Sequence, residues 1–444
     1  MTNPIFGCGD IRAHLKPSAL CTEMVKVELA LVQAQAEHGV VPDAAAANIR
    51  NRLESAKVDL DVLRAGVASA GVPVPELVKS LRAQLDTKDA DWLHYGATSQ
   101  DIVDTAYCLC FKACLSHIED DMVRLIDLLA DLSLQHADTL MLARTRGQLA
   151  TPITLGLRLA QWAQPLTSLE AESDAVRAVA LRVQLGGASG SRNVFGGKGA
   201  EVSKSLAAQL GLEDSAPWHM DRSGFRRLAN WLSRIVSATA KIGRDFSIAS
   251  RGEIGELRPS EGGASSTMPH KSNPVVAEAL QSIVPVATAC EAALAASSAH
   301  AEERDGANWP VEWVMMPMLL EATGAALAHA LNLLDQMVVN ADAMKARIDT
   351  LPDVKAEAFV FALAQEIGRV EATRVVTEAL GSKRPMSELF EQYPELDLNA
   401  ATSDAAFATC AAETAARIFA DRCPATRTRG GGAPAYTTNG AADR

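Results

Sequence analysis

The amino-acid sequence predicts an all-α protein whose centre is a bundle of long helices. Aromatic residues make up only 5% of the 444 residues, and most segments lack the alternating β-branched pattern of strands. Apolar residues recur instead every three or four positions, which is the period of an amphipathic helix. From about residue 106 to 350 such stretches are interrupted only by short loops, and this favours a helical bundle over an α/β sheet.

Three stretches show the helical period clearly. The first contains Leu20, Met24, Val27, Leu31 and Ala34. Gly39 and Pro42 follow it and predict the end of that helix. The second stretch contains Leu228, Trp231, Ile235 and Ile242. The third contains Met315, Leu319, Ala322, Ala326 and Leu333.

The chain is expected to divide into an N-terminal helical domain (1–105), a central long-helix bundle (106–350) and a C-terminal helical domain (351–423). Residues 350–353 contain a proline and break the helical pattern, which sets the second boundary. The last segment, 424–444, holds Gly430-Gly431-Gly432 and few residues that could be buried. That composition predicts a disordered tail.

Many of the predicted helices are rich in alanine and apolar on more than one face. A helix that is apolar most of the way round must be buried on most sides. In a water-soluble chain this favours an oligomer in which helices of different subunits pack together. The alternative is a thick monomeric bundle.

Charge and cysteine content restrict the class of protein. The formal net charge is −12, which argues against a nucleic-acid surface but permits a local basic pocket for an anionic ligand. The eight cysteines lack paired metal-type spacing, and Cys108, Cys110 and Cys114 fall within one predicted helix. No uninterrupted apolar run reaches the roughly 18 residues of a membrane span, and residues 1–10 lack the pattern of a secretion signal. We therefore expect a cytoplasmic protein with reduced thiols and no membrane partner.

The most informative segment is residues 260–274, called here the 260–274 loop. It combines small residues and hydroxyls with Lys271 and Asn273, and its glycines and prolines argue against helix or strand. Glycine hinges together with serine and lysine suit a lid that closes over an anion. A carboxylate, Glu278, follows on the next predicted helix.

Two further segments carry polar groups that a helical scaffold does not require. In residues 94–105, Thr98 and Ser99 precede a helical run, so they are either helix caps or donors for a bound carboxylate. In residues 143–154, Arg144, Arg146 and Gln148 precede Pro152. They are either ordinary surface residues or a bidentate clamp for carboxylates.

The pattern Gly-Gly-x-Ser-Ser-x-Met-Pro-x-Lys-x-Asn-Pro over residues 262–274 closely resembles the mobile loop of the fumarase/aspartase superfamily. The likeness runs over roughly residues 5–425 and includes segments 27–30, 39–42, 185–190 and 217–222. It implies a three-domain all-α fold with a long central bundle. It also implies a homotetramer in which three subunits supply each active site, with no cofactor and no metal.

Two details favour one branch of that superfamily. Residues 72–79 look like the Pro-Val-x-Pro-Leu-Val segment of bacterial 3-carboxy-cis,cis-muconate cycloisomerases, and residues 304–313 are similar to their Trp-x-x-Glu-Trp region. There are also two departures. Arg146 stands where the lyases usually have a histidine that relays to a glutamate matched here by Glu278, and Ala264 replaces a loop glycine. Arginine cannot act as a general acid near neutral pH, which weakens a fumarase-type interpretation. The cycloisomerase branch often lacks that histidine as well, so the resemblance to this branch is supported.

The resemblance assigns roles to individual residues. Ser265 would act as the base that removes a proton next to a carboxylate, and Lys271 would stabilise the resulting charge. Glu278 would be a structural relay. The remaining candidates would bind the substrate: His94, Thr98, Ser99, Arg146, Gln148, Ser266, Asn273 and Arg304. His219 and His300 lie in or beside the resembling segments and receive no role.

These assignments imply addition or elimination next to a carboxylate through an aci-carboxylate, acting on a small di- or tricarboxylate. The first choice is cycloisomerisation (lactonisation) of 3-carboxy-cis,cis-muconate in aromatic catabolism. The alternative is a C–N lyase that releases fumarate from an N-substituted aspartate or related succinyl compound, as adenylosuccinate and argininosuccinate lyases do. A remote alternative is a non-catalytic helical structural protein.

Overall fold

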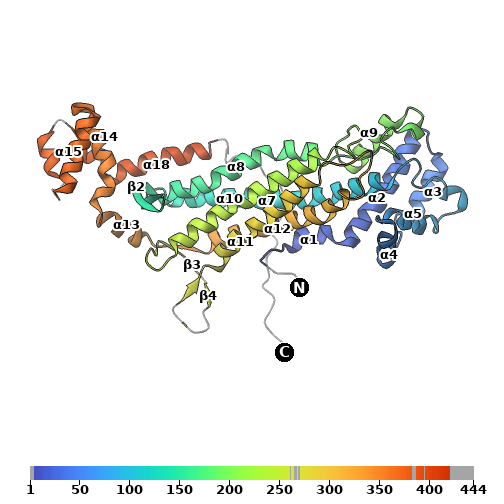
Figure 1. Cartoon of the computed structure of the whole chain (residues 1–444), viewed down its shortest axis with the longest axis horizontal. Helices are drawn as coiled ribbons and strands as arrows, with labels where there is room; N and C mark the ends of the chain where they lie inside the picture. The colour runs from blue at the N-terminus through green and yellow to red at the C-terminus, as the bar shows by residue number, and fades with distance from the viewer. Residues whose placement is uncertain are drawn as a thin grey trace.

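The computed structural model describes residues 5–260, 262–264, 268, 271–382, 387–394 and 396–420. The molecule is elongated and built almost entirely from helices (Figure 1). The all-α prediction is therefore confirmed. The predicted disordered tail, 424–444, lies outside the described residues.

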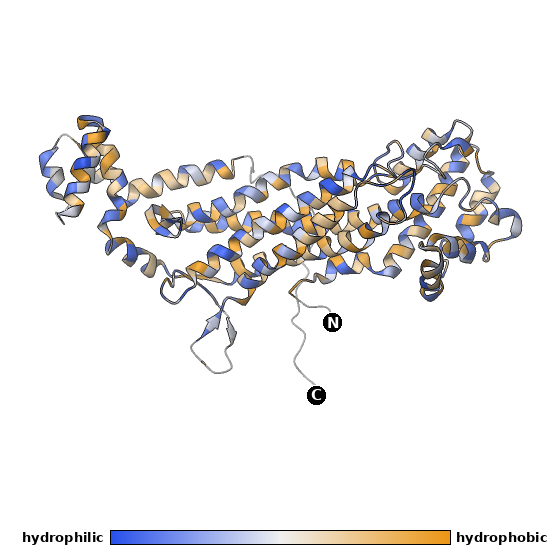
Figure 2. Cartoon of the chain, viewed as in Figure 1, coloured by the Kyte–Doolittle hydropathy of each residue, from blue (hydrophilic) through white to orange (hydrophobic). Residues whose placement is uncertain are grey.

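Five long helices form the central bundle. They are α7 (Ser99–Gln135), α8 (Leu155–Ala180), α10 (Ser223–Ala249), α11 (Val275–Ala296) and α12 (Trp309–Asp335). Helix α10 packs against α8, α11 and α12, while α7 packs against α8 and α12. Apolar residues are spread along these helices (Figure 2), and most of the buried ones belong to one large hydrophobic core. At about 1.5 Å per residue, the 37 residues of α7 span roughly 55 Å.

Most of the N-terminal helices pack beside one end of the bundle, whereas α1 (Gly9–Leu15) lies against α7 and α12 nearer its middle (Figure 1). The others are α2 (Pro17–Glu37), α3 (Asp43–Leu53), α4 (Leu60–Ala70), α5 (Val74–Arg82) and α6 (Thr87–Ala90). Two later elements, η1 (Asn193–Phe195) and α9 (Gly199–Leu210), lie in the same region, where α9 packs against α2. Helix α2 ends just before Gly39, which has a φ of +63°. The three helices predicted from periodicity correspond to α2, α10 and α12.

The chain after the bundle forms the opposite end of the molecule. It contains α13 (Ala341–Asp349), η2 (Pro352–Lys355), α14 (Ala356–Ile367), α15 (Arg369–Gly381), α16 (Ser387–Gln392), α17 (Leu398–Ala401) and α18 (Asp404–Ile418). Helices α14 and α15 share a small hydrophobic core of their own, and α18 returns to pack along α8. The proposed domain boundaries near residues 105 and 350 stay a prediction.

Three small antiparallel ladders interrupt the helices. They pair β1 (Leu140–Thr145) with β2 (Gln148–Thr154), β3 (Leu257–Pro259) with β6 (Met337–Val339), and β4 (Gly263–Ala264) with β5 (Ser272–Asn273). The sequence analysis did not predict the β1–β2 hairpin. Its turn has Arg146 at φ +53° and Gly147 at φ +81°, the positive values that a two-residue hairpin turn requires.

The expectation that the 260–274 loop contains no strand is wrong at its two ends. Gly263 pairs with Asn273, and Ala264 pairs with Ser272, so the extended backbone satisfies its hydrogen bonds by pairing with itself. A Cβ atom at Gly262 would lie 1.6 Å from the Ser272 hydroxyl oxygen. Glycine at this position therefore permits the close approach of the two sides of the loop.

Helices α11 and α12 are long and apolar enough to cross a membrane by length and composition alone. The sequence argument missed them because it required an uninterrupted apolar run. Both helices lie within the bundle, yet only 33% of the most apolar window of α11 is buried, against 56% for α12. Apolar surface on α11 is thus left uncovered by the rest of the chain.

Candidate active site

The first turn of α7 is the centre of the best-defined polar site. Thr98 occupies the N-cap position with an extended backbone (φ −129°, ψ 164°), and Ser99 is the first helical residue. The Thr98 backbone N–H donates to the Asp101 carboxylate over 3.0 Å. The helix-cap interpretation of Thr98 is therefore correct in position, and the helix start remains a region of positive dipole.

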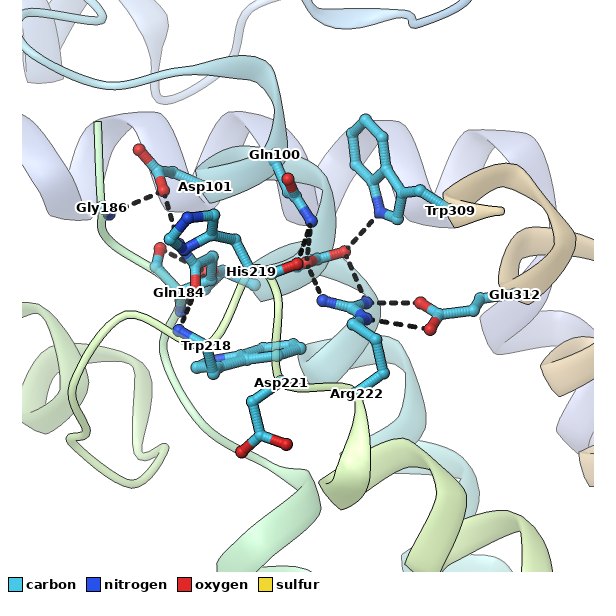
Figure 3. A network of polar contacts seen from close by, with 12 residues as sticks. Gln100, Asp101, Gln184, Gly186, Trp218, His219, Asp221, Arg222, Trp309 and Glu312 are labelled. Carbon is cyan, nitrogen blue, oxygen red and sulfur yellow. Dashed lines mark hydrogen bonds and ion pairs between the residues drawn. The ribbon is translucent and has the colours of Figure 1, made fainter. Parts of the chain in front are cut away.

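Asp101 connects this helix start to the glycine-rich segment 185–190. Its carboxylate accepts hydrogen bonds from the backbone N–H of Gly186 (2.8 Å) and from the Gln184 amide (3.0 Å), both labelled in Figure 3. It also accepts from the backbone N–H of Gly187 (2.9 Å). Burial raises the pKa of Asp101 to about 6, although these hydrogen bonds act in the opposite direction. Asp101 thus fixes the 185–190 segment against α7.

A buried ion-pair network lies beside this segment (Figure 3). The Arg222 guanidinium contacts Asp104 at 2.7 Å and pairs with Glu312 through two hydrogen bonds. The side chains of these three residues are 0%, 1% and 5% exposed. Burial alone would lower the pKa of Arg222, but the two carboxylates raise it, so the arginine stays charged. Trp309 also donates to Asp104, over 2.8 Å.

Arg304 extends from this network toward the 185–190 segment. Its guanidinium donates to the backbone oxygen of Ala188 (3.1 Å) and to the Gln100 side chain (3.3 Å), and the residue itself is exposed. The structure therefore brings four predicted residues, His94, Thr98, Ser99 and Arg304, to the same end of α7.

Two histidines that the sequence analysis left without a role join this site. His219 is 8% exposed, and its Nδ1 atom is buried with no hydrogen-bond partner in the described chain. Both ring nitrogens of His300 are likewise buried and unpartnered there. Burial lowers the pKa of both rings, assisted by Arg304 for His219 and by Arg222 for His300. Buried polar atoms of this kind are usually satisfied by water or a bound group. The sequence feature that could have identified these histidines is their position: His219 lies within segment 217–222, and His300 lies shortly before segment 304–313.

The second predicted segment lies on the β1–β2 hairpin. Arg144 is not a free clamp, because its guanidinium binds both oxygens of the buried Glu256 carboxylate at 2.9 and 2.7 Å. Arg146 and Gln148 are exposed at the tip. Within the described residues the Arg146 side chain makes no hydrogen bond or ion pair, so its planar fork is available to a ligand.

The third predicted segment is only partly described. Ser265 and Ser266 lie outside the described residues. Lys271 is exposed, Asn273 is half-buried in β5, and Glu278 is exposed in the first turn of α11. No group of three or more His, Cys, Asp or Glu side chains that could hold a metal ion occurs in the described parts of the chain.

Within one chain the first segment lies apart from the other two, whereas Arg144 of the hairpin contacts Glu256, which directly precedes β3. The hairpin follows the far end of α7, roughly 55 Å along that helix from Thr98. The 260–274 loop follows β3, which pairs with β6 just beyond the far end of α12. Because Trp309 at the start of α12 contacts Asp104, the loop and the hairpin both lie away from the first turn of α7.

A profile of the lyase family matches residues 13–287. The chain belongs to this family, within the fumarase/aspartase superfamily, and is an enzyme of that superfamily. It is 36% identical to a 3-carboxy-cis,cis-muconate cycloisomerase of Pseudomonas aeruginosa over 84% of this chain and 83% of the relative. It is 32% identical to a nitrosuccinate lyase of Streptomyces davaonensis over 89% and 88% of the two chains. The 3-carboxy-cis,cis-muconate lactonizing enzyme of Pseudomonas putida has a similar structure, with a TM-score of 0.83, 31% identity and coverage of 94% and 97%. The predicted superfamily and branch are confirmed.

Proposed function

We propose that this enzyme catalyses the cycloisomerisation of 3-carboxy-cis,cis-muconate to its lactone, in the cytoplasm and as a step of aromatic catabolism. The observation that carries the proposal is the similarity to cycloisomerases over more than four fifths of the chain, for example 84% for the relative in Pseudomonas aeruginosa. Arg146 supports it, because an exposed guanidinium at the hairpin tip suits the binding of an additional substrate carboxylate.

The proposed assembly is a homotetramer in which three subunits contribute one segment each to a shared site. The distance of the first segment, at the start of α7, from the hairpin and the 260–274 loop within one chain supports this arrangement. Apolar residues exposed on α11 and α12 also support it: Val275 (45%), Val314 (53%) and Met318 (47%). Such surface marks a place where another chain packs. Four identical chains with twofold interfaces would cover it.

The proposed chemistry passes through an aci-carboxylate. In ring closure, an oxygen of one substrate carboxylate forms a C–O bond to the diene, and the electron pair moves onto the neighbouring carboxylate. The Ser265 hydroxyl then delivers a proton to the α-carbon and is reprotonated from solvent; in ring opening the Ser265 oxygen takes that proton back.

The other candidate residues would hold the charges in place during these steps. Lys271 and Asn273 would bind the carboxylate that gains charge, with Ser266 beside them. Thr98, Ser99, Arg146 and Gln148 would bind the others, together with His94 and Arg304. The proposal places Glu278 as a structural relay and uses no cofactor.

Ultraviolet absorbance tests the reaction. Lactonisation consumes a conjugated diene, so the absorbance of 3-carboxy-cis,cis-muconate should fall when enzyme is added. The second candidate is release of fumarate from a succinyl compound, which the similarity to nitrosuccinate lyase favours. Fumarate release raises absorbance near the ultraviolet edge. Efficient cleavage of succinyl compounds with no action on the muconate would replace the first proposal by the second.

Mixing inactive variants tests the assembly. Ser265→Ala and Arg146→Ala chains, each inactive alone, should regain partial activity after they are unfolded together and reassembled. Some mixed tetramers then contain a site whose segments are all intact. Size measurement by light scattering should give four chains. An active monomer, or no recovery in correctly sized mixtures, would contradict the shared site.

A further inference from the structure

A buried carboxylate holds the first predicted histidine of the site. The Nδ1 atom of His94 lies 2.7 Å from the Oε1 atom of Glu28, on α2. The Glu28 side chain is 0% exposed and that of His94 18% exposed. The Glu28 Oε2 atom is also buried and has no partner among the described residues. Burial of an acidic side chain requires compensation, and the imidazole is the group that provides it.

The backbone of the loop before α7 is fixed by other contacts. The Gln35 amide donates to the Tyr95 oxygen (2.6 Å), and Arg82 donates to the Leu93 oxygen (2.8 Å). Glu28 is therefore not needed to anchor the backbone of this loop, because its hydrogen bond is made to the imidazole ring of His94. His94 itself has a φ of +62°, which is uncommon for a residue other than glycine. Strained backbone that is held by several neighbouring contacts is typical of functional sites.

The second ring nitrogen of His94 is left available. Its Nε2 atom makes no hydrogen bond to the described residues and is not among the buried unpartnered atoms. Burial disfavours the protonated ring, but the Glu28 carboxylate outweighs it and raises the pKa of His94. Asp101 acts in the same direction, and Arg82 opposes it. The ring is thus oriented by one nitrogen and can donate a proton or a hydrogen bond through the other.

We propose that Glu28 is a positioning residue: it binds Nδ1 of His94 so that Nε2 presents an N–H donor to a substrate carboxylate at the start of α7. The inference rests on the proposed function for the identity of that carboxylate. It adds to that function a residue of α2, Glu28, which lies in the resembling segment 27–30 but received no role from the sequence. A protonated ring binds an anion more strongly than a neutral one, so the contact should weaken as the ring loses its proton.

The test compares two substitutions on α2. Glu28→Gln keeps the size and an oxygen acceptor for Nδ1–H but removes the negative charge. Gln35→Met is the matched control, because it removes a tether of the same loop and leaves the charge near His94 unchanged. The pKa of His94 is measured in the intact protein by histidine hydrogen–deuterium exchange with mass spectrometry, and kcat/KM for 3-carboxy-cis,cis-muconate is measured against pH.

Glu28→Gln should lower the pKa of His94 and move the alkaline limb of kcat/KM to lower pH. Catalytic efficiency should fall roughly ten- to a hundredfold at about pH 8, with a smaller loss in acid. Gln35→Met should leave both the pKa and the limb in place. An unchanged pKa in Glu28→Gln, or the same limb shift in both variants, overturns the proposal. The exchange measurement needs no turnover, so inactivity of the wild-type enzyme toward the muconate would refute the proposed function separately.

Discussion

Arg222 and Arg146 show two opposite uses of the same side chain. Arg222 is fully buried and shares its donors between Asp104 and Glu312 behind the first turn of α7. Arg146 is exposed at the tip of the β1–β2 hairpin and has no partner in the described chain. The difference teaches that the ion pairs behind the start of α7 are completed within one chain. The tip of the hairpin, in contrast, carries a guanidinium that no described residue of the same chain contacts.

The same substitution at both arginines tests this contrast most strongly. Arg222→Met leaves two buried carboxylates without a counter-charge, and we expect the free energy of unfolding to fall by about 3–5 kcal/mol. Arg146→Met should change it by less than about 0.5 kcal/mol, because the side chain is exposed. Urea unfolding followed by circular dichroism measures both. Equal losses in the two variants would remove the distinction between the regions.

Substitution of Ser265 tests whether the 260–274 loop supplies the catalytic group. Ser265→Ala should reduce kcat by about 10²- to 10⁴-fold, because it removes the group that transfers the proton, while substrate binding persists. Ser266→Ala should have a milder effect, since that hydroxyl is expected to bind only. Steady-state kinetics and calorimetric binding separate the two. Near-normal turnover in Ser265→Ala would exclude it as the base.

Arg146→Lys sharpens the proposed role of the hairpin. An ammonium keeps the charge but loses the bidentate fork, so kcat/KM should fall by roughly ten- to a hundredfold without loss of stability. The control is Arg64→Lys, since Arg64 is 75% exposed on α4 and, among the described residues, forms an ion pair with Asp61 alone. Unchanged kinetics in Arg146→Lys would show that the fork does not contact the substrate.

The smallest expected effect is the contribution of the Glu28–His94 pair to the free energy of unfolding, which should depend on pH. The pKa of His94 is raised in the folded protein, so the pair's stabilisation is fully present below the usual histidine pKa. It is lost as pH rises through the folded value. The difference in unfolding free energy between wild type and His94→Gln should therefore shrink from weakly acidic to alkaline pH. A difference that grows with pH would reverse the sign of the proposed interaction.

The sequence predicted the scaffold better than the site. Apolar spacing located α2, α10 and α12, because a buried helix face repeats along the chain itself. The Arg222–Asp104–Glu312 network was not predicted, since its members are separated by up to 208 positions and only packing brings them together. The 217–222 and 304–313 segments were noticed through a resemblance, which gave no indication that a buried ion pair connects them.

The strands were also not predicted from the sequence. The β1–β2 hairpin depends on positive φ values at Arg146 and Gly147, and an arginine rarely signals such a turn. The two-residue strands of the 260–274 loop arise from pairing across the loop, which no local propensity reports. The Glu28–His94 contact was also missed, because a glutamate on an amphipathic helix is usually solvated.

The length of α7 has a consequence for insertions and deletions. The helix runs without a break for 37 residues between the Thr98 cap and the hairpin. One inserted residue would rotate everything beyond it by about 100° and displace it by about 1.5 Å. The hairpin tip would then leave its place relative to the other helices of the bundle. Loops on the N-terminal side, such as the one between α3 and α4, impose no such register. Chain length should therefore be far less tolerant of change within α7 than between those short helices.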